Sequence, residues 1–324
     1  HSAVADFYES LDEPELSGVV ASHWLDAVEA AGSGEESEHV RAKASESLLA
    51  AADRADLLGS FAQVVALCLR GVDLAVNPAD RAQLLGRAAR AAHSALDDRA
   101  RDFAKRAMDE ASASDDAGAQ VFTASVYAKL LDDHGESHEA WPRLAEVLDQ
   151  HPGETPLHAT AMAELARSYM LDGQPQALEA AERALEVAER LEMFREVAEL
   201  WATRGAGLSI KGRIWEAEVI LNAALDMARE HQLLSTKRRV MANISYMSET
   251  LVSPFVDEVI DDARRLGDDL LLVEALAVKA DNLRNQLRWE EEEALSEEID
   301  RRATTQASRD DFENAQDYKA MLLG

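Results

Sequence analysis

Hydrophobic residues recur along this chain with the spacing of an α-helix, and the apolar segments come in pairs. Each pair is joined by a very short turn. Gly59, Gly135, Gly173 and Gly212 mark four of these turns, at intervals of 76, 38 and 39 residues. Asp97 stands where the series lacks a glycine. A two-helix unit that recurs about every 38 residues is typical of a helical-hairpin solenoid.

The same spacing predicts the individual elements. A short helix is expected over about 3–11 and a second over about 15–31. Seven hairpins should follow, over residues 38–75, 78–113, 116–151, 155–191, 194–231, 235–266 and 268–303. A last helix is predicted from Arg309 to Leu323. We therefore expect a helical lead-in segment, residues 1–37, and a repeat array, residues 38–324, that ends in a capping helix.

Composition favours the same fold class. Hydrophobic residues make up 47% of the chain but aromatic residues only 5%, because alanine and leucine supply most of the apolar side chains. This mixture favours closely packed helices over sheets. No alternating strand pattern of useful length is present. The prediction is an all-α protein, a right-handed α-α superhelix.

Charge and cysteine content limit the partners and the compartment. The formal net charge is −29, which repels nucleic acids and anionic lipid headgroups, so neither is expected to bind. Cys68, the single cysteine, excludes an internal disulfide and lies in an apolar run, where a buried thiol is expected. No long uncharged apolar stretch or secretory leader is visible. We expect a cytoplasmic fragment.

Two segments carry a family resemblance. LLGSFAQVVALCLRGVDL and RGAGLSIKGRIWEAEVILNAAL resemble tetratricopeptide repeats. Gly205 stands where two helices of such a hairpin approach, and Ala140, Ala177 and Ala217 stand where they cross. The period is longer than the family's, and Leu or Val often replaces its aromatic residues. The resemblance covers about residues 38–303, and it implies a concave surface, lined by the first helices, that holds extended peptides through Asn and Lys side chains.

A second resemblance lies near the start. The run ELSGVVASHWLDAVEA, Glu15 to Ala30, is similar to a segment of large bacterial regulatory ATPases, and His23-Trp24 is its most specific part. In those proteins the segment introduces a C-terminal repeat region. They include adenylate/guanylate cyclase-like proteins and LuxR-type or maltose-activator-type transcription regulators. The resemblance implies that this chain is the C-terminal part of a larger signalling protein.

Motifs for catalysis are absent from the sequence. No phosphate-binding loop, nucleophile motif or zinc-type Cys/His cluster is found, so we predict no enzyme activity, no cofactor and no metal ligands. His134 and His138 have a spacing that two metal ligands on a helix would need. Gly135 interrupts that helix, however, and a solvated polar turn with Asp132 is the expectation.

One polar pattern follows the repeat. Arg204, Asn243 and Asn282 are each 39 residues apart, and Lys279 lies one helical turn before Asn282. Residues one period apart become neighbours in a stacked array, so these four are the candidate partner-binding residues, on the first helices of hairpins five to seven. The alternative is that they only tie neighbouring helices together.

The functional hypothesis is a non-catalytic, regulatory protein-interaction module that binds a protein or peptide on the concave surface. One alternative is a peptide or small-molecule sensor domain of a larger regulator. A second alternative is a complete enzyme of unfamiliar type. The oligomeric state and the identity of the partner stay open at this point.

Overall fold

The structure is a computed structural model that describes residues 1–31, 35–95, 97–247, 256–266 and 269–302. Across these residues it contains sixteen α-helices and one short 3-10 helix, and no strand. The prediction of an all-α fold is therefore confirmed. The expected last helix, Arg309 to Leu323, lies outside the described residues.

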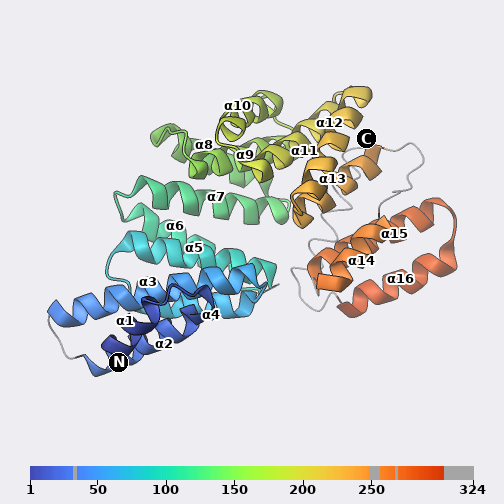
Figure 1. The fold of residues 1–324 in the computed structure, drawn as a ribbon. Coiled ribbons are helices and arrows are strands. Elements are labelled where there is room, and N and C mark those ends of the chain that lie inside the picture. Colours follow the sequence, from blue (N-terminus) through green and yellow to red (C-terminus); the bar gives the residue numbers. More distant parts are fainter. Residues whose placement is uncertain (32–34, 96, 248–255, 267–268, 303–324) are drawn as a thin grey trace. The chain divides into compact units, whose positions relative to one another are not determined.

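The helices form consecutive hairpins (Figure 1). The first helices are α3 (Glu35–Leu57), α5 (Pro78–Ser94), α7 (Ala117–Asp133), α9 (Pro156–Leu171), α11 (Phe194–Ile210), α13 (Leu234–Met247) and α15 (Asp269–Asn285). The second helices are α4 (Phe61–Leu74), α6 (Ala100–Ser112), α8 (Ser137–Gln150), α10 (Ala177–Arg190), α12 (Ile214–Glu230), α14 (Val256–Leu266) and α16 (Trp289–Arg302). Before them come α1 (Ser2–Glu9), η1 (Pro14–Leu16) and α2 (Ser17–Ala30). The seven predicted hairpins are all present, so the prediction of a tetratricopeptide-like solenoid is confirmed.

The glycines that mark the repeat sit at left-handed turn positions. Gly212, between α11 and α12, has a φ of 74°, a conformation that costs glycine little because it has no Cβ. In the seventh hairpin Leu287 takes this position with a φ of 59°. A leucine gives no turn signal in the sequence, which is why the glycine series does not extend to the seventh hairpin.

The chain divides into two compact units, His1–Tyr127 and Ala128–Gly324, with the division inside α7. In the first unit α2 packs on α3, where Val20 and Trp24 join Val40 and Ala44 in one buried cluster. The lead-in segment is thus continuous in packing with the first hairpin. The predicted organisation, residues 1–37 and 38–324, describes the repeat pattern and stays a prediction.

In the second unit the first helices of successive hairpins lie side by side. α9 packs against α11, and α11 packs against α13. The second helices α10, α12 and α16 pack against their own first helices, and α14 packs against α15. Gly205 brings α11 close to α12, since a Cβ at this position would lie 2.5 Å from Cγ of Leu221. Ala140 and Ala217 are buried, in agreement with the predicted helix crossings. This layer of first helices carries the candidate site.

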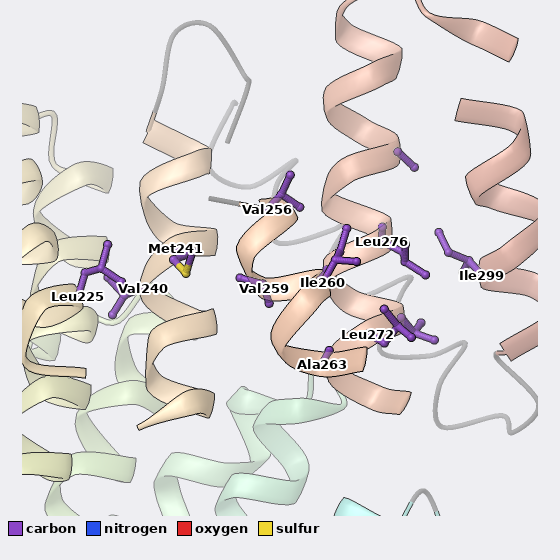
Figure 2. Packing of buried hydrophobic residues seen from close by; sticks show 14 of the residues in the cluster. Leu225, Val240, Met241, Val256, Val259, Ile260, Ala263, Leu272, Leu276 and Ile299 are labelled. Atoms are coloured by element: carbon purple, nitrogen blue, oxygen red, sulfur yellow. The ribbon is translucent and has the colours of Figure 1, made fainter. Parts of the chain in front are cut away.

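A large apolar cluster lies among the C-terminal hairpins of the second unit (Figure 2). It joins Val240 and Met241 of α13 to Ile260 of α14 and Leu276 of α15, all buried. Trp289 is 55% exposed at the first position of α16. In the part of the chain that the structure describes, no helix is both long and apolar enough to cross a membrane.

Candidate partner-binding site

Side chains on successive first helices of the second unit pair with one another at a distance of one repeat. The hydrogen-bonded partners are 34 to 40 residues apart in sequence. We call this set the polar strip. Its members are Asp132 and Asp133 on α7, Thr160, Glu164, Arg167 and Ser168 on α9, Glu196, Glu199 and Thr203 on α11, and Thr236 and Arg239 on α13.

Glu199 is the centre of the strip between α11 and α13. Its carboxylate accepts hydrogen bonds from the Thr236 hydroxyl, at 2.6 Å, and from Nη1 of Arg239, at 2.5 Å. Nη2 of Arg239 donates to the hydroxyl of Thr203 at 2.6 Å. Burial acts to raise the pKa of Glu199, but Arg239 and the Thr236 hydroxyl outweigh it and hold the pKa at about 2. Glu199 is therefore ionised and paired at neutral pH.

Arg167 has the corresponding place between α7 and α9. Its Nη2 donates to Asp133 at 2.8 Å, and its Nη1 lies 3.8 Å from the carboxylate of Glu164. The hydroxyl of Ser168 donates to Oδ2 of Asp132 at 2.6 Å. Burial raises the pKa of Asp132 to about 6, although Arg167 and the Ser168 hydroxyl favour its ionised form. Oδ1 of Asp132 and Oε2 of Glu164 are buried without a hydrogen-bond donor.

The charged groups of the strip reach solvent only in part. The side chains of Arg239, Arg167 and Glu199 are 15%, 18% and 27% exposed. The hydroxyl-bearing residues Ser168, Thr203 and Thr236 are buried. The strip holds five carboxyl groups and two guanidinium groups, so it carries an excess of negative charge. It can offer hydrogen-bond acceptors and anionic groups to a partner.

The four predicted binding residues lie on the predicted helices but serve internal contacts. Asn243 on α13 is buried, and its Nδ2 donates to the carbonyl of Ala202 on α11 at 3.3 Å. Asn282 on α15 is buried to the same degree. Such burial fits the alternative interpretation of the four candidate residues, in which their side chains tie neighbouring helices together.

Arg204 and Lys279 point to second helices. Arg204 pairs with Glu182 on α10 at 3.2 Å, and Lys279 pairs with Asp257 on α14 at 2.6 Å. The four candidate residues therefore do not form one exposed binding surface. Their role in partner binding stays a prediction without support from the geometry.

The polar strip was not predicted from the sequence, and the predicted environment of Asp132 is wrong. Asp132 was expected in a solvated turn but is buried and bonded to Ser168 of the next hairpin. His138 is exposed, as the solvated-turn interpretation requires. The signal that could have revealed the strip is the recurrence of opposite charges one repeat apart, as for Asp133 and Arg167.

Comparisons with known proteins identify the fold. No protein-family model matches this chain, and no curated protein matches its sequence. A Rap protein complexed with competence and sporulation factor has a similar structure, with a TM-score of 0.60 and 13% identity over 99% of this chain and 98% of that one. Aspartyl phosphate phosphatase F from Bacillus subtilis gives a TM-score of 0.53 and 10% identity over 84% of this chain and 73% of that one.

A third similar structure is a signal-transduction ATPase with numerous domains and a tetratricopeptide-repeat sensor, from Pyrococcus horikoshii. It gives a TM-score of 0.51 and 13% identity, over 79% of this chain and 43% of that one. At these identities the likeness establishes the tetratricopeptide-like fold and leaves function to be argued from the chain's own residues.

Proposed function

We propose that this chain is a non-catalytic regulatory module that recognises an extended peptide segment of a partner protein along the polar strip. The supporting observation is the strip itself, with half-buried charges on three adjacent first helices, α9, α11 and α13. A repeat array supplies surface rather than a catalytic cleft, and it presents the same face of each first helix in turn.

In such an array the distance between neighbouring first helices can be compared with the length of an extended peptide. Packed helices are about 8–10 Å apart, and an extended peptide advances about 3.3 Å per residue. A peptide that crosses the strip therefore meets a new first helix about every three residues. Glu164 on α9 and Glu196 on α11 would serve as successive contact points.

The charge of the strip selects the partner. Five carboxyl groups face two guanidinium groups, and the whole chain carries a formal net charge of −29. Opposite charge on the partner raises the association rate and excludes like-charged competitors. The proposed partner is a segment that carries Lys or Arg, and neither nucleic acid nor an anionic membrane is a proposed partner.

The sensor alternative has support of a different kind. The similar Rap protein was solved in complex with competence and sporulation factor, and the P. horikoshii protein carries its repeats as a sensor. The resemblance at Glu15 to Ala30 adds a larger cyclase-like or LuxR-type signalling protein as the proposed context. In this alternative a free peptide or small molecule, rather than a segment of a protein, occupies the strip.

Peptide selection tests the proposal. Peptides from a random twelve-residue library are selected on the wild-type chain, and their affinities are measured by fluorescence polarisation. The double variant Glu164→Gln/Glu196→Gln removes two charges of the strip but keeps an oxygen acceptor at each position. We expect enriched Lys and Arg in the selected peptides, and a loss of affinity of roughly ten-fold, about 1.4 kcal/mol, in this variant.

The matched control is Glu154→Gln/Glu182→Gln, which removes two exposed charges of the same unit outside the strip. Its affinity for the selected peptides should stay close to that of the wild type. An equal loss in both double variants, or no loss in the strip variant, would overturn the proposed binding surface.

A further inference from the structure

Three side chains with metal-binding atoms meet in the first unit, and none of them belongs to the polar strip. They are His1, His23 and Asp26, and one ligand atom of each lies within 4.8 Å of those of the other two. Nδ1 of His1 is 3.4 Å from Oδ2 of Asp26, and Nδ1 of His23 is 4.0 Å from the same oxygen. His23 belongs to the His23-Trp24 pair that the partner-binding proposal leaves unexplained.

The surrounding helices hold these groups in place. His23 and Asp26 are three residues apart on α2, so they share one face of the helix. His1 precedes α1, which packs on α2 and contributes Ala5 to the buried cluster around Trp24. The ring of Tyr8 stacks on the imidazole of His23, with centroids 5.7 Å apart and an interplanar angle of 3°. The imidazole plane is therefore fixed before any ligand arrives.

His23 carries an unused coordination atom. Its Nδ1 is buried and has no hydrogen-bond partner, although the rest of the side chain reaches solvent. A buried polar atom without a partner is uncommon and calls for an explanation, such as an ion. At 4.0 Å the Asp26 carboxylate is too distant to accept a hydrogen bond from it.

We propose that His1, His23 and Asp26 form a site for a divalent transition-metal ion of the zinc type. A tetrahedral zinc ion with ligands at about 2.0–2.1 Å places neighbouring ligand atoms about 3.3 Å apart. The observed separations from Oδ2 of Asp26, 3.4 Å to His1 and 4.0 Å to His23, come close to this value, so small movements of the His1 and Asp26 side chains complete the site. Two imidazoles and a carboxylate suit zinc, and a fourth position stays open to water.

Binding at this site would join α1 to α2. His1 lies at the start of α1 and the other two ligands lie on α2, so one ion connects both elements of the lead-in segment. The sequence gives no signal for this site, because the two histidines belong to different elements and follow no known ligand spacing. The proposal is independent of the polar strip, since the two sites lie in different units.

Calorimetric titration of Zn²⁺ into the untagged, chelator-treated chain tests the site. The wild type should bind one ion per chain, and His23→Gln and Asp26→Asn should each weaken binding at least ten-fold. His138→Gln, which removes an exposed histidine of the second unit, is the matched control and should bind like the wild type. Co²⁺ in place of Zn²⁺ should give the visible absorption of a tetrahedral complex in the wild type and lose it in both ligand variants.

Two results would overturn the site. One is wild-type binding of Zn²⁺ that is no stronger than that of Asp26→Asn. The other is a tetrahedral Co²⁺ spectrum that both ligand variants retain. Because Asp26 is half exposed and belongs to no buried cluster, its variant should fold, and circular dichroism checks this. The pair of variants thus separates loss of a ligand from loss of structure.

Discussion

Asp132 is a carboxyl group whose surroundings favour its neutral form. Burial is the main cause of its raised pKa, about 6 in the folded chain against 3.8 as the ordinary value. Between these two pH values the folded state binds more protons than the unfolded state, so the free energy of unfolding falls as pH rises. The penalty is complete above pH 6 and amounts to roughly 3 kcal/mol.

Asp132→Asn should relieve this penalty, because the amide carries no charge and its oxygen still accepts from Ser168. We expect the free energy of unfolding at pH 7.5 to rise by about 1–3 kcal/mol, with the gain shrinking toward pH 4. Urea denaturation from pH 4 to 7.5 measures it. Asp226→Asn, at an exposed position, is the control and should change little. A destabilised Asp132→Asn at pH 7.5 would contradict the assignment.

Gly205 is a second residue whose replacement should change the free energy of unfolding in a predictable direction. The Cβ of an alanine would lie 2.5 Å from Leu221, which is fully buried and has little room to move. We expect Gly205→Ala to lower the free energy of unfolding by about 1–3 kcal/mol despite the higher helix propensity of alanine. Gly18→Ala, on α2, has open space around its Cβ and should be neutral or stabilising. Equal melting temperatures for the two variants would rule out close packing at Gly205.

At the scale of elements, polar pairs about one repeat apart differ in burial and should differ in strength. Glu199 and Arg239 are largely buried, whereas Glu154 and Arg190, also about one repeat apart, are both more than half exposed. Double-mutant cycles with alanine should give a coupling energy of about 1.5–3 kcal/mol for the first pair and below about 1 kcal/mol for the second. Similar coupling energies for the two pairs would contradict the expectation that burial strengthens the Glu199–Arg239 pair.

The helices and hairpins were predictable because their signals are local. Each apolar segment has the period of a helix, and glycines such as Gly173 announce the turn that follows. The turns at Glu192, Gln232 and Leu287 were not predictable, because these residues adopt a positive φ without a glycine's signal. The site was harder still, since the partners of Glu199 become neighbours only when two hairpins stack. Arg204, Asn243 and Asn282 share one spacing, but identical spacing of polar residues also marks side chains that tie neighbouring helices together.

At the scale of the whole molecule, a repeat array that recognises partners should lack chemistry of its own. We expect the isolated chain not to hydrolyse ATP, not to form cyclic nucleotides and not to bind duplex DNA at physiological salt. The reasons are the missing phosphate-binding loop and the net charge of −29. Phosphate release, cyclic-nucleotide and gel-shift assays measure these. An activity that a substitution within this chain abolishes would overturn the regulatory-module proposal.

Site-specific photo-crosslinking tests the central claim most directly, because it reports which helix layer a bound peptide touches. A benzophenone amino acid replaces Glu196 on α11, in the polar strip, or Asn222 on the exposed face of α12, and each chain is irradiated with a selected peptide. The account predicts strong crosslinking from position 196, competed by excess unlabelled peptide, and little from position 222. Crosslinking from position 222 with none from 196 would show that the first-helix layer is not the binding surface.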